Sequence, residues 1–316
     1  MSLAIGVTGA SGFLGRSLAA FLAARGDRVT RFVRGRRAGA GEIAWDPLAG
    51  QLDECALEPL DGIVHLSGAG IADERWTPER RRLLVDSRVR STATLARALA
   101  ACAKRGARPR VLVSASAVGW YGDRGDEPLD ERSGPGRGFL AELAQAWEAA
   151  AAPARDAGVR VAHPRTGLVL SPDGGVLAKL LLPFRLGAGG PLGDGRAWWS
   201  WIALSDWLDA VGFALEAPAL AGAFNAVAPE PVRQGDFART LGRALHRPAF
   251  MPAPALALRA IMGRGRADEM LLASQRALPH ALTAAGFRFR EPELARLLAR
   301  LLAPPVTRAR PSARGS

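Results

Sequence analysis

The sequence has few of the residues that define several familiar protein classes. Cys55 and Cys102 are its two cysteines, so no disulfide framework can form, and no Cys/His spacing indicates a zinc site. No apolar run reaches the length of about 18 residues that predicts a transmembrane helix. The N-terminus lacks the basic segment followed by an apolar one that a signal peptide would need. These absences predict a globular, cytoplasmic protein with no membrane partner and no metal site.

Lysine is also scarce: Lys104 and Lys179 are the two lysines among 42 basic residues, and the others are arginines. The formal net charge of +12 is one that a nucleic acid or an acidic ligand would balance. The arginines are scattered, however, and no basic stripe alternates with aromatic residues, as it does in proteins that bind single strands. We therefore expect no nucleic-acid partner, and binding through net charge is the weakest of three functional hypotheses.

A glycine-rich stretch near the N-terminus is the most informative part of the chain. Residues 5–15 read I-G-V-T-G-A-S-G-F-L-G, which combines a short strand pattern, three spaced glycines and the start of an apolar helix. In a dinucleotide-binding turn, Gly9 permits the tight turn, Gly12 lets a pyrophosphate approach the backbone, and Gly15 lets the helix pack close to the strand. The helix N-terminus then faces the phosphates. The alternative is a glycine-rich turn without a ligand.

The end of the second predicted strand, residues 28–33, distinguishes between two cofactors. NAD-specific folds place an acidic residue about 20 residues after the glycines, where it holds the ribose 2′-hydroxyl. Here residues 31–37 read R-F-V-R-G-R-R, with no acid. Val33 and Arg34 stand at this point, and an arginine can bind a 2′-phosphate through charge-assisted hydrogen bonds. The sequence thus predicts NADP(H), the alternative being a solvated arginine cluster in a loop.

Strand-like and helix-like segments alternate as far as residue 165. Further strands are expected at 42–46, 61–66, 110–116 and 159–164, and helices at 78–104 and 139–155. This alternation predicts an α/β fold with a doubly wound parallel sheet, the Rossmann arrangement.

The chain is expected to divide into a large domain and a small one. The Rossmann domain would span residues 1–228 and include a substrate-side loop at 166–204. Prolines then separate short helices in a small, mainly helical part at 229–303. Residues 304–316 are rich in proline, serine and glycine, and we expect this tail to be disordered.

Several motifs resemble those of the extended short-chain dehydrogenase/reductase superfamily. The resemblance is to its atypical, epimerase-like branch, whose members carry a family-specific C-terminal domain and are often named nucleotide-sugar epimerases or cell-division-inhibitor-like proteins. The matching segments are T-G-A-S-G-F-L-G (8–15), H-L-S-G-A-G-I (65–71), S-R-V (87–89), S-A-S-A-V-G-W-Y-G (114–122), L-L-P-F-R-L-G-A-G-G-P-L-G (181–193) and S-W-I-A-L-S-D (200–206).

The resemblance implies roles for individual residues around an NADP(H) cofactor. The cofactor-binding residues that it implies are Gly9, Ser11, Gly12, Phe13, Leu14 and Gly15 at the pyrophosphate turn, Val33 and Arg34 at the 2′-phosphate, Leu66, Ser67 and Gly68 over the adenosine, and Ser114, Arg88 and Arg165. Arg88 stands where typical extended members have an asparagine, and Arg165 closes the sixth strand near the nicotinamide half. The two arginines either contact a cofactor diphosphate or an anionic substrate, or form structural ion pairs.

The chain departs from the superfamily at the usual catalytic pair, Tyr-x-x-x-Lys. Phe139 and Leu143 stand at these two positions, and neither can move a proton. Ser116 matches the usual serine partner of that pair. Tyr121 is the single tyrosine of the chain, so it becomes the best remaining proton donor, with Asp123 as another acid/base. The alternative for Tyr121 is an aromatic residue packed under the nicotinamide or in the core.

Three functional hypotheses follow. The first is an NADP-dependent oxidoreductase or epimerase acting on a small polar substrate, with Ser116 and Tyr121 as catalytic residues. The second is a non-catalytic NADP(H)-binding sensor that signals to a partner. The third is the nucleic-acid binding described above. We expect a monomer or a homodimer.

Overall fold

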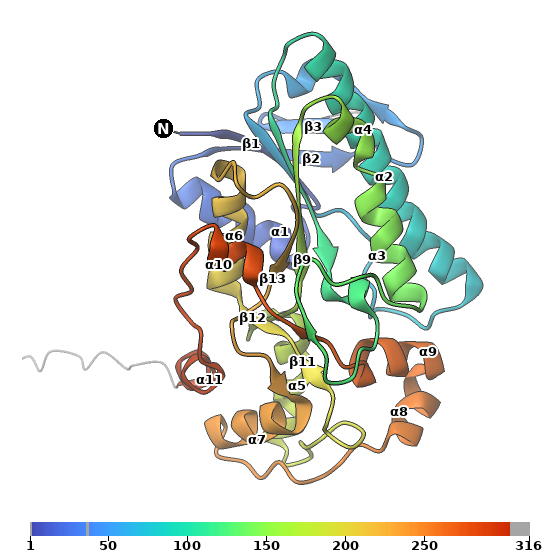
Figure 1. Ribbon diagram of the computed structural model, residues 1–316, viewed down its shortest axis with the longest axis vertical. Helices are drawn as coiled ribbons and strands as arrows, with labels where there is room; N and C mark the ends of the chain where they lie inside the picture. Colours follow the sequence, from blue (N-terminus) through green and yellow to red (C-terminus); the bar gives the residue numbers. More distant parts are fainter. Residues whose placement is uncertain (1, 36–37, 304–316) are drawn as a thin grey trace, which may run out of the picture.

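The computed structural model describes residues 2–35 and 38–303, so the tail predicted at 304–316 and part of the arginine cluster at 31–37 lie outside the described residues. The main sheet runs in the order β13-β9-β6-β5-β1-β2-β3-β4, with β7 (Ser116–Ala117) also paired to β9 (Figure 1). Its strands are β1 (Ala4–Thr8), β2 (Arg28–Arg34), β3 (Glu42–Asp46), β4 (Gln51–Leu52), β5 (Gly62–His65), β6 (Val111–Ser114), β9 (Arg160–Thr166) and β13 (Gly222–Ala226).

The pairing confirms the doubly wound parallel sheet. Neighbouring strands are parallel except for the pair β3–β4. The chain moves outward through β1, β2 and β3, and then returns to the other side of β1 with β5. The order therefore reverses between β1 and β5, and ligands of such sheets bind at the carboxyl ends of the strands at this point.

Helices cover both faces of the sheet, and their apolar sides form two cores (Figure 1). Helices α1 (Phe13–Ala24) and α6 (Leu204–Glu216) pack on one face, and α2 (Pro78–Lys104), α3 (Phe139–Ala149) and α4 (Ala152–Asp156) on the other. The helix predicted over 139–155 is thus divided in two. Pro153 lies in the first turn of α4, and a proline cannot donate the backbone bond that would continue α3.

The segment predicted as a loop at 166–204 is largely structured. It contains β10 (Leu168–Ser171), α5 (Gly175–Arg185), β11 (Trp198–Trp199) and β12 (Trp201–Ala203). Buried side chains of α5 pack with Trp199 and Trp201 in a third core. The helix α5 was not predicted because glycines and prolines surround its apolar positions.

The C-terminal part is mainly helical, as predicted. It comprises β14 (Val232–Arg233), α7 (Gln234–Ala244), α8 (Ala255–Met262), α9 (Arg264–Arg266), the π-helical turn η3 (Ala267–Leu272), β15 (Arg276–Ala277), α10 (His280–Ala284) and α11 (Leu294–Leu302). Helices α7 and α11 pack onto the third core, whereas Leu282 of α10 belongs to the first core beside β13. Residues 280–284 therefore return to the Rossmann sheet.

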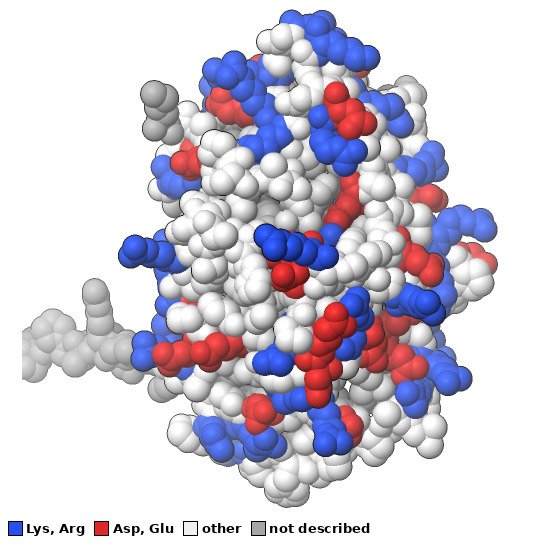
Figure 2. Space-filling view, in the orientation of Figure 1, with Lys and Arg blue, Asp and Glu red and all other residues white. Residues whose placement is uncertain are grey.

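Two observations concern possible nucleic-acid and membrane partners: the distribution of surface charge and the character of the helices. On the face shown in Figure 2, basic and acidic side chains are interspersed over most of the molecule. None of the helices in the described residues combines the length and apolar character that crossing a bilayer requires.

Candidate functional site

The glycine turn between β1 and α1 has the geometry that the sequence predicts. Gly9 has a φ of +66°, which favours glycine, and Gly12 N–H donates to the Gly9 carbonyl oxygen at 3.0 Å. A Cβ atom at Gly9 would lie 2.7 Å from the carbonyl oxygen of Leu66, and one at Gly15 would lie 2.2 Å from that of Gly9. A Cβ atom at Gly12 would have one near neighbour, the Gly9 carbonyl oxygen at 3.3 Å. Gly9 and Gly15 are therefore required by packing, whereas Gly12 faces open space.

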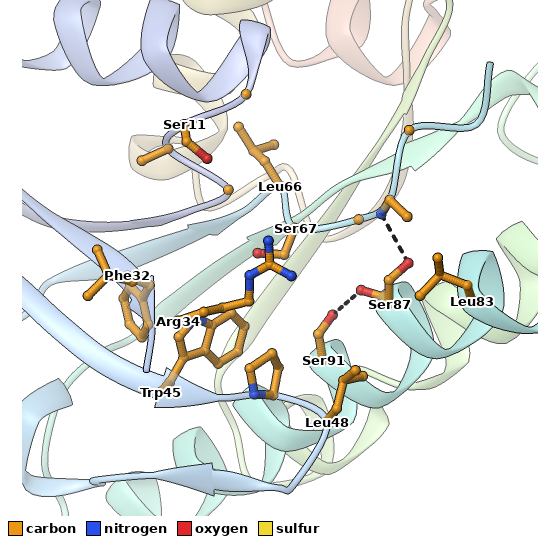
Figure 3. Close-up of a pocket in the computed structure, with 18 of the residues that line it drawn as sticks. Ser11, Phe32, Arg34, Trp45, Leu48, Leu66, Ser67, Leu83, Ser87 and Ser91 are labelled. Carbon is orange, nitrogen blue, oxygen red and sulfur yellow. Dashed lines mark hydrogen bonds between the residues drawn. The ribbon is translucent and has the colours of Figure 1, made fainter. Parts of the chain in front are cut away.

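That open space is a cavity of about 930 Å³ at the carboxyl ends of β1, β2, β3 and β5. Its size lies within the range of small-molecule and cofactor sites. Figure 3 shows the side chain of Arg34 extending into the cavity toward Ser67, with Trp45 on one side and Ser87 and Ser91 of α2 on the other. The predicted site residues that line the cavity are Gly9, Ser11, Gly12, Val33, Arg34, Leu66, Ser67 and Gly68.

Sequence reasoning missed part of this cavity. Two further arginines, Arg16 and Arg31, line it, and so do residues after β3, along the loop after β5 and on α2. Trp45 packs edge-on against Phe32, with ring centres 5.6 Å apart. The signal was available, because β3 is a parallel strand beside β2 and its carboxyl end must meet the same edge of the sheet.

A buried hydrogen-bond chain holds the loop after β5. The Thr8 hydroxyl lies 2.7 Å from His65 Nδ1 and accepts N–H bonds from Leu66 at 3.1 Å and Ser67 at 3.3 Å. On the other side, His65 Nε2 lies 3.2 Å from the Ser91 hydroxyl. Burial lowers the pKa of His65 to about 3, so its ring is neutral at pH 7. This chain fixes the two residues that cover the cavity next to Arg34.

Arg88 is a half-buried cation without an ion-pair partner among residues 2–35 and 38–303. Its guanidinium donates to the carbonyl oxygens of Leu84 at 3.2 Å and Ala69 at 3.0 Å, and lies 5.1 Å from the centre of the Trp147 ring. Burial, with a smaller contribution from Arg80, lowers its pKa to about 10, which leaves it charged at pH 7. Of the two alternatives for this arginine, the described residues provide no ion pair, and contact with an anionic ligand stays a prediction, since Arg88 does not line the cavity.

Arg165 instead forms a structural ion pair. Its guanidinium donates to both carboxylate oxygens of Glu148, each at 2.9 Å, and stacks 3.5 Å from the centre of the Trp120 ring. Ser116 Oγ donates to the same Glu148 carboxylate at 2.6 Å. Glu148 was absent from the predicted site, yet it joins two of the predicted residues.

Tyr121 lies in the interior and does not line the cavity. Its side chain is fully buried, and its hydroxyl lies 2.8 Å from Asn225 Oδ1 and 2.9 Å from the Asp130 carbonyl oxygen. The hydroxyl also accepts a bond from Arg165 at 3.1 Å. Burial raises the pKa of the phenol, and Arg165 offsets this only in part. These contacts give Tyr121 a packing role and argue against the predicted role of proton donor.

Other predicted residues also have structural contacts. Asp123, the other acid/base considered, accepts backbone N–H bonds from Ser274 at 3.1 Å and Gly125 at 3.3 Å. Phe13 packs against Gly174, and Leu14 packs against the first core. The Ser114 hydroxyl is buried and has no hydrogen-bond partner within the described residues.

The positions of the usual catalytic pair are occupied by apolar packing. The Phe139 ring lies 5.1 Å from that of Trp76, and Arg81 lies 5.0 Å above it. Leu143 is buried. The first turn of α3 is capped from the C-terminal part, since Leu140 N–H donates to Glu269 at 2.7 Å. No group of three or more potential metal ligands occurs in the parts of the chain that the structure describes.

The parallel sheet, the glycine turn and the cavity at the reversal of strand order define a Rossmann-fold protein of the dinucleotide-binding type. Comparison with known proteins identifies the family. The NAD-dependent epimerase/dehydratase family matches residues 5–227, and a domain of unknown function matches residues 253–301. The chain belongs to the NAD-dependent epimerase/dehydratase family, which confirms the resemblance noted in the sequence.

Individual relatives cover nearly the whole chain. An epimerase family protein of Mycobacterium bovis is 42% identical over 285 residues, or 90% of this chain and 93% of the relative. The human epimerase family protein SDR39U1 is 37% identical over 300 residues, or 94% of this chain and 99% of the relative. A crystal structure of that human protein with NADPH has a TM-score of 0.86 at 35% identity, over 95% of this chain and 99% of that chain.

A second solved structure has a longer chain. The nucleoside-diphosphate sugar epimerase from Corynebacterium glutamicum has a TM-score of 0.77 and is 36% identical, over 96% of this chain and 58% of that chain.

Proposed function

We propose that the chain binds NADP(H) in the 930 Å³ cavity and acts as an oxidoreductase or epimerase-like enzyme on a small polar substrate. The observation that carries the cofactor proposal is Arg34 at the end of β2, which points into the cavity where NAD-specific folds have an acid. Arg16 and Arg31 line the same cavity and add positive charge, although acidic residues also line it, namely Glu42, Asp46, Asp73 and Glu74. The human relative crystallised with NADPH supports the same assignment.

The residues present fit both phosphorylated parts of this cofactor, the pyrophosphate and the 2′-phosphate. The space in front of Gly12 and the N-terminus of α1 would hold the pyrophosphate, because free N–H groups and the helix dipole favour an anion there. Arg34 would hold the 2′-phosphate through charge-assisted bonds. Arg88, a cation without a carboxylate partner, would contact a further anionic group.

The chemistry of hydride transfer is supplied by the nicotinamide, and the protein orients it and handles the proton. Of the predicted catalytic residues, Ser116 is also buried and does not line the cavity, but its hydroxyl donates to Glu148, which pairs with Arg165. We propose that Ser116 positions the substrate oxygen. With Phe139 and Leu143 at the usual acid/base positions, turnover would be slow compared with relatives that have the full pair.

A second candidate function, a cofactor sensor, rests on a different observation. Residues 69–74 line the cavity in part, and the same loop is bonded to the C-terminal part. Arg75 donates to the carbonyl oxygens of Ala260 at 3.3 Å and Ile261 at 2.9 Å, and Arg266 donates to that of Ala72 at 2.8 Å. A ligand that orders this loop would also order α8 and α9.

Two measurements distinguish these functions. The first is a screen of sugar nucleotides, ketones and quinones for NADPH oxidation, followed by Ser116→Ala on any substrate that reacts. The enzyme proposal predicts turnover that falls at least tenfold in the variant. The second is amide hydrogen exchange of residues 255–266 with and without NADPH. Slower exchange with no turnover on any substrate would favour the sensor, and turnover unaffected by Ser116→Ala would contradict the role of this serine.

A further inference from the structure

A second concave surface lies in the C-terminal part, away from the cofactor cavity. It is a groove of about 670 Å³ beside α7. Its charged wall is formed by Arg239 and Arg243, one turn apart on α7, and by Arg247 after the helix end. Its apolar lining includes Ala249 and the ring of Phe250. We refer to these five residues as the α7 groove.

The positive charge of the groove is largely uncompensated. The residues that line the groove include three arginines and no acidic residue. Asp236 pairs with Arg239, whereas Arg243 and Arg247 make no ion pair within the described residues. In Figure 2, basic side chains gather over α7 at the lower left of the molecule, next to uncharged surface at the bottom of the view. The groove is therefore complementary to negative charge.

Large apolar side chains surround the groove. Phe250 lines the groove, and Leu182, Leu186 and Met251 lie in the two chain segments beside it; these four side chains are between 52% and 75% exposed. The groups adjoin one another, since Arg247 donates to the Arg185 carbonyl oxygen at 3.0 Å and Met251 to that of Gly189 at 3.2 Å. Exposed apolar surface of this extent, rimmed by charge, marks an interaction site.

The backbone at the groove is also unusual. His246, which lies between Arg243 and Arg247 and lines the groove, has a φ of +52°. A residue with a Cβ atom is uncommon in this conformation, which is normally given to glycine or asparagine at the end of a helix. Such positions are often retained at binding sites, where the side chain has a use that outweighs its strain.

We propose that the α7 groove binds an acidic protein segment that carries a large apolar side chain. The carboxylates of the segment would pair with Arg243 and Arg247, and its apolar residue would pack against Ala249 and Phe250. A second copy of the chain would bring the same positive charge to the interface. A flat bilayer would leave the groove empty, and Phe250 is the one aromatic residue lining it, which is too few for stacking nucleic-acid bases.

The test is a selection of phage-displayed random 12-residue peptides on the full-length protein, followed by binding of the selected peptides to the double variant Arg243→Glu/Arg247→Glu. The matched control is Arg288→Glu, which makes the same charge change at an exposed arginine outside the groove. Selected peptides are then synthesised, labelled and titrated by fluorescence anisotropy. All variants are first checked for an unchanged thermal midpoint and unchanged NADPH affinity, so that misfolding is distinguished from loss of the groove.

The expected result is a set of peptides rich in Asp and Glu around Leu, Phe or Trp. Their affinity should fall at least tenfold in Arg243→Glu/Arg247→Glu, change less than twofold in Arg288→Glu, and weaken as salt is raised. The proposal is overturned if no peptide is enriched, if the enriched peptides lack acidic residues, or if both variants bind equally. Binding of phosphatidylserine vesicles or of an oligonucleotide with the same dependence on Arg243 and Arg247, without acidic peptides, would assign the surface to those partners instead.

Discussion

Replacing Arg34 by alanine tests the cofactor assignment most directly. The guanidinium of Arg34 extends into the cavity toward Ser67, and no acidic residue stands at the end of β2. A charge-assisted hydrogen bond contributes about 1.5–3 kcal/mol, which corresponds to a loss of roughly 10- to 150-fold in NADPH affinity. Arg31 and Arg16 line the same cavity and remain in the variant, so we expect the lower half of this range.

The assay is calorimetric titration of NADPH and NADH at one fixed ionic strength, because surface charges near the cavity make binding sensitive to salt. Arg34→Ala should weaken NADPH and leave NADH within twofold of wild type. The matched control is Arg28→Ala, an exposed arginine at the opposite end of the same strand. Equal affinity of wild type for the two cofactors, or an equal loss of both in Arg34→Ala, would refute the reasoning.

Three further predictions concern the glycine turn, the buried histidine and the tyrosine. Gly12→Val should keep the fold but abolish cofactor binding. Gly15→Val should lower the free energy of unfolding by about 3 kcal/mol or more, because its Cβ would overlap a carbonyl oxygen. Equal behaviour of the two variants in circular dichroism and denaturant melts would contradict this prediction. His65 is neutral in the folded protein, whereas its pKa in the unfolded chain is about 6.5. Between pH 6.5 and 3 the unfolded state therefore binds one more proton, and the free energy of unfolding falls as the pH is lowered. The expected loss is about 2 kcal/mol at pH 5 and should shrink in His65→Gln; unchanged urea midpoints between pH 7 and 5 would count against it. Tyr121→Phe should cost about 1–3 kcal/mol by leaving Asn225 without its partner, with little effect on any turnover, and a catalytic defect without loss of stability would restore Tyr121 as a donor.

The sheet and the glycine turn were predictable because their determinants are local in sequence. The φ of Gly9, the close approach at Gly15 and the position of Arg34 at a strand end all follow from short patterns and from the way in which parallel strands meet at one edge. The helix α5 escaped prediction because glycines and prolines surround its apolar positions, which acquire meaning only when Trp199 and Trp201 pack against them.

The interior network around Ser116 could not be predicted in the same way. Glu148 is 32 residues from Ser116 and 17 from Arg165, and nothing in its own neighbourhood marks it as their partner. The same limit applies to Tyr121, whose hydroxyl is bonded to Asn225, 104 residues away. Sequence proximity to a strand end placed Tyr121 near the site, but the direction of its side chain depends on contacts that form only in the folded chain.

If Arg88 contacts an anionic group of the ligand, as proposed above, occupancy of the site would affect how much folded protein a cell retains. The charge is half-buried, and its contacts are two carbonyl oxygens and the ring of Trp147. A ligand that brings an anion to it removes part of the desolvation cost and binds the folded state selectively, which raises the free energy of unfolding with ligand concentration. Because cellular proteases degrade the unfolded fraction, the amount of this protein in a cell would then follow the supply of its ligand.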